Sequence, residues 1–494
     1  MCAACVPHCG PEVNYGPQTR AFQPHAARLV RFDNSRKMSS NGCMTVEFHS
    51  QAASRFNELA QELRTRAKVF TLPAERRKAN TLIYPMAQLS ENDVIGEVQW
   101  RQRSVNGYGE ETGRYWEAGS ETIGYEGDDY VTAKNLAKRL AEAGPLKNRV
   151  SERFLLDALF AWLQEMSNGN ETTAFTDFLA KQASSAIAAH EIWIPVYRSY
   201  SSKDISVGAV NFKTITPEML ERWYSRIPAE ERKNAPGADV ALTRQRSMPQ
   251  ATLAACTVIE AEPIKANEMA QSATDEAVAM LRFLSDVNWT CRITSHVLPI
   301  GKENIHTTMD IHVENGSIKS IRKGVIERGP AGWNVDSARM PPMNGGVLEL
   351  LQDLASQRNA TEFRTDVYGA LQLHARASIA TEVAHKLVFV VAAAESIFLR
   401  NASEPIQKNL GERMAFLIGQ SVDERRKVIK NVDEFYGIRS GLIHHGKEVQ
   451  DHQKDVVDEF FVNVWFSFIA LMRSASKWKT RDEMFSALEE RKLS

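Results

Sequence analysis

The stretch Gly329–Gly346 contains Gly-Pro, Pro-Pro and Gly-Gly pairs, and the pattern of apolar residues differs on its two sides. Such pairs interrupt regular structure, so this stretch is expected to be a linker. Before it, the alternation of Ile192, Ile194 and Val196 is typical of a strand and stands among helical patterns. After it, every apolar pattern has helical spacing. The sequence therefore predicts a multidomain fold, with an α+β N-terminal region followed by an all-α helical bundle.

The same patterns give the expected domain boundaries. A chain of 494 residues is too long for one ordinary core, so two or three domains are expected. Residues 1–45 are rich in Pro, Gly and His without periodicity, and are expected to form a disordered leader. The other regions are a mixed, mostly helical region of unknown role at 46–189, an α+β region at 190–328, the linker at 329–346 and the helical bundle at 347–480.

Several elements are predicted within these regions. Strands are expected at Thr81–Met86, Val94–Trp100 and about Trp289–Leu298, with a bulge at Gly208 and a hairpin turn at Asn315-Gly316. The bundle helices are expected at about 346–357, 361–378, 381–399, 406–418, 424–436 and 455–477.

The net charge and the hydropathy of the sequence limit which partners the protein is expected to bind. The net charge is -1, which argues against wholesale electrostatic capture of nucleic acid, so any RNA must bind at a local site. The longest apolar stretches, Leu387–Ala394 and Phe460–Met472, are shorter than the roughly 20 residues that a bilayer requires. We therefore expect no membrane partner and a cytoplasmic protein.

Two groups of residues carry side chains that can bind a metal ion. The spacing Cys2-x-x-Cys5 is typical of zinc ligands, but a zinc site needs a second matched pair. Cys9 and Cys43 do not have the spacing of such a pair. One face of a predicted strand carries His306, Thr308, Asp310 and His312, which could bind a metal ion. An ordinary solvent-exposed face of an antiparallel strand shows the same pattern of polar residues. The expectation is no metal and no cofactor. A metal-dependent enzyme in the N-terminal part is kept as a rival function.

The strongest chemical motif lies near the C-terminus, at Tyr436-Gly437-Ile438-Arg439-Ser440-Gly441-Leu442-Ile443-His444-His445-Gly446. Arginine is permanently charged and grips phosphate oxygens, while histidine exchanges protons near neutral pH. Cleavage of RNA by its own 2′-hydroxyl requires a base, an acid and a cation that stabilises the phosphorane, and it requires no metal. The plainer interpretation is that these side chains stabilise a helix end.

The spacing of the motif limits how it works. Arg439 and His444 are five residues apart, so on an unbroken helix they diverge by about 140°. Either the helix breaks at Gly441 and Gly446, or two copies of the motif face one another across a two-fold axis. We favour the homodimer.

The motif resembles the Arg-x4–6-His signature of HEPN domains, in the Tyr-x-x-Arg-Ser-x-x-x-His-Gly form of the Apea-like branch. The helix Leu387–Leu399, with Glu395 among apolar residues, resembles that branch's second helix, and 413–419 resembles the segment that follows. More weakly, the resemblance covers Glu191–Leu471. One departure is that His445 stands where Gly usually follows the histidine directly.

This resemblance implies a HEPN-type helical bundle that dimerises and acts as a metal-independent endoribonuclease. It implies Arg439 and His444 as the catalytic pair, with Tyr436 and Ser440 in support and His445 as the competing imidazole. Such proteins are often toxins or effectors in bacterial anti-phage defence and abortive infection, which implies a phage-derived trigger.

The sequence leaves two alternatives open, one for the partner of Glu395 and one for the function of the bundle. A carboxylate among apolar residues needs a partner, and Glu395 could pair with Arg439 or Arg413, either to orient the site or to neutralise a buried charge. The alternative function is a catalytically inactive HEPN dimer that binds RNA or a protein, because a fold alone does not establish activity.

Overall fold

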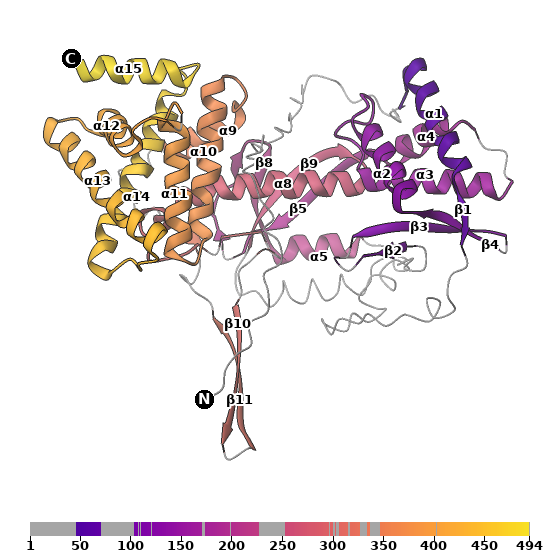
Figure 1. The fold of residues 1–494 in the computed structure, drawn as a ribbon, viewed down its shortest axis with the longest axis horizontal. Helices are drawn as coiled ribbons and strands as arrows, with labels where there is room; N and C mark the ends of the chain where they lie inside the picture. Colours follow the sequence, from indigo (N-terminus) through magenta and orange to yellow (C-terminus); the bar gives the residue numbers. More distant parts are fainter. Residues whose placement is uncertain are drawn as a thin grey trace, which may run out of the picture. The chain divides into compact units, whose positions relative to one another are not determined.

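The computed structural model (Figure 1) describes residues 46–70, 103–106, 108, 110–119, 121–169, 173–197, 199–226, 252–295, 297–299, 302, 306–314, 317–326, 333–335, 346–401 and 403–493. The expected leader with its cysteines and the strands expected at Thr81–Met86 and Val94–Trp100 lie outside these residues. The predicted α+β N-terminal part and all-helical C-terminal part are both confirmed at the level of secondary structure.

The first part of the described chain combines helices with an antiparallel sheet. Its strands are β1 (Lys68–Phe70), β2 (Arg103–Val105), β3 (Glu111–Ala118) and β4 (Glu121–Glu126), in the order β1-β4-β3-β2. Its helices are α1 (Ser50–Thr65), α2 (Gly127–Ala141), α3 (Glu152–Ser167) and α4 (Phe175–Ala186). They share one buried cluster, in which the rings of Trp116, Tyr125 and Phe160 meet with centroids less than 6 Å apart.

A second antiparallel sheet follows, in the order β5-β9-β8-β7. Its strands are β5 (Ala188–Pro195), β7 (Ile205–Val207), β8 (Val210–Ile215) and β9 (Thr252–Ala261). The bulge expected at Gly208 is wrong: Gly208 has φ +59° and begins the two-residue turn between β7 and β8. Helix α5 (Pro217–Ser225) follows the Thr216 cap, and α8 (Pro263–Arg282) follows β9.

Smaller elements complete this region. The strand expected at Trp289–Leu298 is wrong, because Asp286–Trp289 forms the 3-10 helix η3 and the chain after it is irregular. Strands β10 (His306–Glu314) and β11 (Ser317–Ile326) pair antiparallel on either side of the predicted Asn315-Gly316 turn. Short strands β6 (Ser199–Tyr200) and β12 (Trp333–Asn334) pair in parallel, so part of the predicted linker is ordered against the α+β region.

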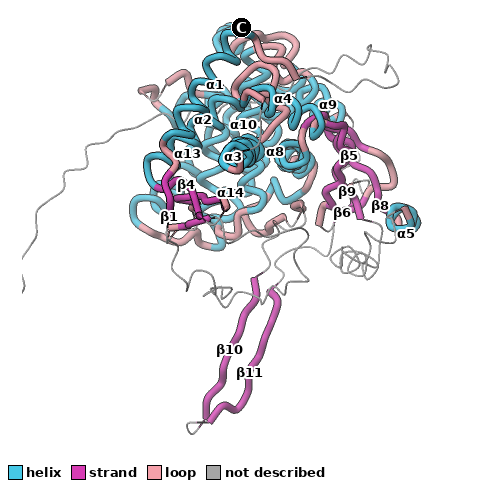
Figure 2. Tube along the Cα trace, turned by 90° about the vertical axis from the view of Figure 1, so that its right-hand side faces the viewer, coloured by secondary structure: helices cyan, strands magenta, loops and turns pink. Residues whose placement is uncertain are grey.

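From Gly346 to Leu493 the described residues form only helices and connections between them (Figure 2). The helices are α9 (Val347–Ser356), α10 (Glu362–Ile379), α11 (Val383–Phe398), α12 (Ile406–Ile418), α13 (Val422–His445), α14 (Asp451–Ser474) and α15 (Arg481–Leu493). The first six match predicted helices, and α12 has the predicted bounds. Helix α15 lies beyond the predicted end of the bundle, and α13 continues nine residues past its predicted end at Tyr436.

Buried residues on both sides of the predicted linker belong to one hydrophobic cluster, which runs from Val196 to Leu488. At its centre the ring of Phe283, just after α8, stacks on Trp465 of α14 with centroids 5.6 Å apart. Arg282 is 5% exposed and donates to Ser378 Oγ (3.1 Å) and to the Val297 carbonyl (3.0 Å). These contacts tie α8 to the helical bundle.

His374 of α10 lies in the same interior. It is 1% exposed, its ring lies edge-on to Phe283 and Phe468, and neither ring nitrogen has a hydrogen-bond partner among the described residues. Burial lowers the pKa of His374 to about 4. The imidazole is therefore neutral in the folded protein at neutral pH.

This burial predicts an acid-labile core. Between pH 6.5 and pH 4 the unfolded chain binds a proton at His374 that the folded chain does not, so stability present above pH 6.5 is lost as the pH falls. His374→Phe should retain on the order of 2–3 kcal/mol more of its unfolding free energy than wild type over this change. Urea unfolding at pH 7 and pH 4.5 measures it, with exposed His385→Phe as the control. Equal losses in wild type and His374→Phe would contradict the prediction.

Candidate active site

The predicted motif lies within one continuous helix, α13. The Ser421 side chain accepts from the Glu424 amide and the Glu424 side chain accepts from the Ser421 amide, which forms a capping box at its start. At its end Gly446 has φ +61°, and the amides of Gly446 and Lys447 donate to the carbonyls of Leu442 and Gly441. The break considered at Gly441 is therefore wrong, and Gly446 terminates the helix instead of bending it.

Tyr436 fixes the motif to the bundle. Its side chain continues the buried stripe of Val428, Val432 and Phe435, and its hydroxyl donates to Glu395 Oε1 of α11 at 2.7 Å. Burial, and then this hydrogen bond to the carboxylate, raise the pKa of Tyr436 far above its ordinary value. The phenol therefore stays protonated and acts as a hydrogen-bond donor, not as a base.

The partner of Glu395 differs from both expectations. Glu395 accepts a hydrogen bond from Tyr436. Arg413 forms an ion pair with Glu404 at 2.7 Å, and its guanidinium lies over the Phe485 ring, 4.4 Å from the centroid. Glu395 is thus connected to Arg439 through the tyrosine that lies between them, and no direct ion pair forms. Its role is to hold α13 in a fixed rotation against α11.

Arg439 lies one turn beyond Tyr436 on the same side of α13. Its guanidinium carbon is 5.5 Å from the centroid of the Tyr436 ring, within the range of a cation–π contact. The side chain is half-buried, and its Nε is enclosed without a hydrogen-bond acceptor in the described part of the chain. A buried donor left unpaired costs about 1–3 kcal/mol, so a phosphate oxygen placed there would recover that cost.

The other motif side chains are exposed. Ser440, His444 and His445 all lie on the solvent side of α13, and both imidazoles are in its last turn, where a cationic histidine is favoured by the helix dipole. At 100° per residue, His444 and His445 diverge from Arg439 by about 140° and 120°. The unbroken helix keeps both imidazoles of a chain away from its own arginine.

Gly437 and Gly441 within the motif, and Lys447 directly after it, were not predicted as site residues. A Cβ at Gly437 would meet nothing within 4 Å, and one at Gly441 would meet only Lys447 Cδ at 3.8 Å. Gly437, Gly441 and His444 have the spacing i, i+4, i+7, so both glycines lie on the same side of the helix as His444. The signal in the sequence was two glycines inside a helical segment, each costing about 1 kcal/mol relative to alanine. They leave this side of α13 open to close approach.

The segment Glu424–Lys430, which is rich in Arg and Lys and comes shortly before the motif, forms an ordinary helix surface. Arg425 donates to the Gly419 carbonyl at 3.3 Å, Arg426 pairs with Asp423 at 3.5 Å, and Lys430 approaches Glu434 to 3.5 Å. Local partners thus neutralise part of the positive charge of this segment.

Within the described ranges, no group of three or more His, Cys, Asp or Glu side chains is placed to hold a metal ion. The backbone of β10 is described, but the side chains of His306, Thr308, Asp310 and His312 lie outside the described set. No described helix combines the length and apolar character needed to cross a bilayer.

Comparison with known proteins adds no relative. No family model, no curated protein and no solved structure matches this chain. The candidate site therefore depends on the residues of α13 and α11 and on the resemblance of their motif.

The contact between Tyr436 and Glu395 predicts a measurable stability difference. Tyr436→Phe removes the hydroxyl and keeps the ring under Arg439, so the free energy of unfolding should fall by about 1–2 kcal/mol. Glu395→Gln retains an oxygen acceptor and should cost less. Denaturant unfolding of both variants measures these effects, and a Tyr436→Phe variant as stable as wild type would show that the bond does not hold α13.

Proposed function

We propose that the C-terminal bundle is a metal-independent endoribonuclease of the HEPN type. The observation that supports this best is the state of Arg439, a half-buried guanidinium whose Nε has no acceptor among the described residues. It is held over Tyr436 in the same helix that carries two exposed imidazoles. Such a cation is suited to a phosphate oxygen, and imidazoles are suited to proton transfer at neutral pH.

The proposed reaction uses the 2′-hydroxyl of RNA as its nucleophile. One imidazole takes the 2′ proton as the O2′–P bond forms, and a protonated imidazole gives a proton to O5′ as the P–O5′ bond breaks. Arg439 stabilises the additional negative charge of the phosphorane between these steps. The products are a 2′,3′-cyclic phosphate and a 5′-hydroxyl, so neither a metal nor a water nucleophile is needed for the cleavage.

Two copies of the chain supply these groups in this proposal. Within one chain the imidazoles and Arg439 lie on different sides of the unbroken helix α13, whereas a two-fold pairing can bring His444 of one copy to Arg439 of the other. The absence of side chains at Gly437 and Gly441 permits a close approach beside His444. RNA and a second copy of the chain are thus the proposed partners.

The biological role follows from the resemblance to Apea-like HEPN proteins. We propose a cytoplasmic, toxin-like effector in bacterial anti-phage defence, with the N-terminal regions restraining the ribonuclease until a phage-derived trigger appears. An inactive HEPN dimer that binds RNA or a protein is the alternative, which the following assay separates.

The test is cleavage of end-labelled RNA in EDTA by the full chain. Wild type should cut and leave 2′,3′-cyclic ends, and Arg439→Ala should reduce the rate by about 100-fold or more because the phosphorane loses its cation. Separate His444→Ala and His445→Ala variants identify the active imidazole.

The matched control is Arg426→Ala, which removes an exposed arginine from the same helix 13 residues earlier. It should cleave like wild type. If wild type leaves RNA intact in EDTA yet binds it, the inactive binding module is correct. If activity appears only with added metal, the metal-dependent rival is favoured instead.

A further inference from the structure

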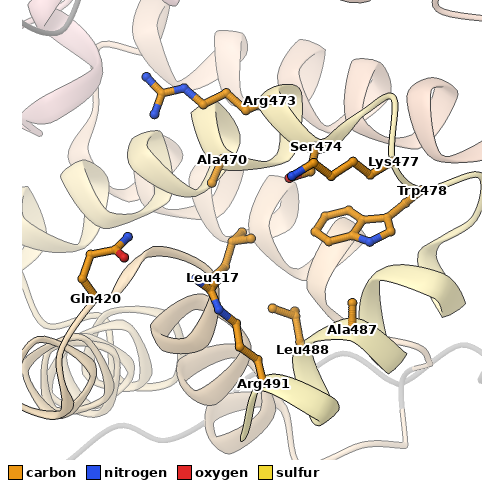
Figure 3. Close-up of a pocket in the computed structure, with 10 residues that line it drawn as sticks. All are labelled: Leu417, Gln420, Ala470, Arg473, Ser474, Lys477, Trp478, Ala487, Leu488 and Arg491. Carbon is orange, nitrogen blue, oxygen red and sulfur yellow. The ribbon is translucent and has the colours of Figure 1, made fainter. Parts of the chain in front are cut away.

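A pocket at the C-terminal side of the bundle has a chemistry that the proposed ribonuclease site does not use (Figure 3). It has a volume of about 480 Å³, within the usual range for a small-molecule site. It forms where the end of α12, the end of α14 and helix α15 meet. Its walls include Leu417, Arg473, Lys477, Trp478, Leu488 and Arg491.

The charge of this pocket is one-sided. Three of its ten lining residues are cationic, and none is acidic. The Arg473 and Lys477 side chains form neither an ion pair nor a hydrogen bond with any residue that the structure describes, whereas nearby Lys492 is bound to Glu412. Arg491 is held in place by donating from Nη1 to the Phe416 carbonyl at 3.0 Å.

Helix ends do not cancel this charge. Helices α12 and α14 both end beside the pocket, and each helix C-terminus carries about half a negative charge. The full positive charges of Arg473 and Lys477 alone exceed these two partial negative charges by about one. Like charges gathered in a concave surface favour an anionic ligand, above all one with several phosphate oxygens.

Apolar and aromatic side chains line the other part of the pocket. Trp478 stands beside Leu488, with Leu417 and Arg491 close by, while Arg473 lies at the outer edge and points away from Arg491 (Figure 3). The edge contact with Phe363, at 5.4 Å between centroids, fixes the Trp478 indole. The indole is half-exposed, so part of its surface is available for stacking with a flat ring.

We propose that this pocket binds a nucleotide, with its phosphates at Lys477 and Arg491 and its base on Trp478. The ligand is either a free nucleotide or one nucleotide of a single RNA strand, since both present a phosphate beside an aromatic base. The pocket is separate from the motif in α13, and the proposal does not depend on the proposed ribonuclease activity.

Isothermal titration calorimetry of the full chain in EDTA tests the proposal. The probes are ATP, pyrophosphate, adenosine and a single-stranded DNA octamer, which lacks the 2′-hydroxyl needed for cleavage. ATP or the octamer should bind saturably, and ATP should bind about tenfold more tightly than either pyrophosphate or adenosine. Lys477→Ala and Arg491→Ala should each weaken binding by about tenfold.

Lys181→Ala is the matched control, because it removes an exposed lysine from α4 and should leave binding unchanged. Trp478→Leu should reduce ATP to the affinity of pyrophosphate, with its melting temperature checked because the indole also contacts Phe363. Tight ATP binding identifies a free nucleotide as the ligand, and binding of the octamer alone identifies a strand. The proposal is overturned if neither ATP nor the octamer binds, if Lys181→Ala weakens binding as much as Lys477→Ala, or if ATP binds but no more tightly than pyrophosphate.

Discussion

The hydrogen bond from the Tyr436 hydroxyl to Glu395 sets the rotation of α13 against α11, and the arrangement of the candidate site follows from that rotation. With Tyr436 turned inward, Arg439 lies at the border of the core, while Gly437, Gly441 and His444 face outward. The arginine is therefore enclosed and restrained, and the imidazoles are accessible. A helix rotated by one residue would place the guanidinium in solvent and lose both properties.

Several elements could be predicted from the sequence because local signals and packing agree. Helix α12 has the predicted bounds, and Thr216 caps α5 as its sequence indicates. Helix α13 was predicted too short, since Gly437 and Gly441 lower helix propensity, yet the burial of Phe435 and Tyr436 and the Gly446 cap outweigh that cost. The strand expected near Val297 is absent, and the Val297 carbonyl accepts a hydrogen bond from the Arg282 side chain.

The sequence predicts which residues belong to the candidate site better than it predicts which of them are in contact. The chemistry of Arg439 and His444 can be read from their residue types, but the partner of Glu395 depends on which side of α13 faces α11, and a sequence does not contain that rotation. Helix α15 was missed because only Met484, Phe485 and Leu488 are buried in it. Without α15 the cationic pocket could not be anticipated, since Arg491 and Leu488 form part of its wall.

An active site shared between two copies of the chain, with Arg439 from one and a histidine from the other, is the proposal that links this fold to its chemistry. Its most direct test is co-expression of Arg439→Ala with a His444→Ala/His445→Ala chain under two different tags, followed by purification through both tags and an RNA cleavage assay in EDTA. Each variant alone should be inactive, and the mixed dimer should regain part of the wild-type rate because one arginine and the partner's imidazoles remain. A chain carrying all three substitutions, paired with Arg439→Ala, should stay inactive. A mixed dimer as inactive as that control would contradict the claim.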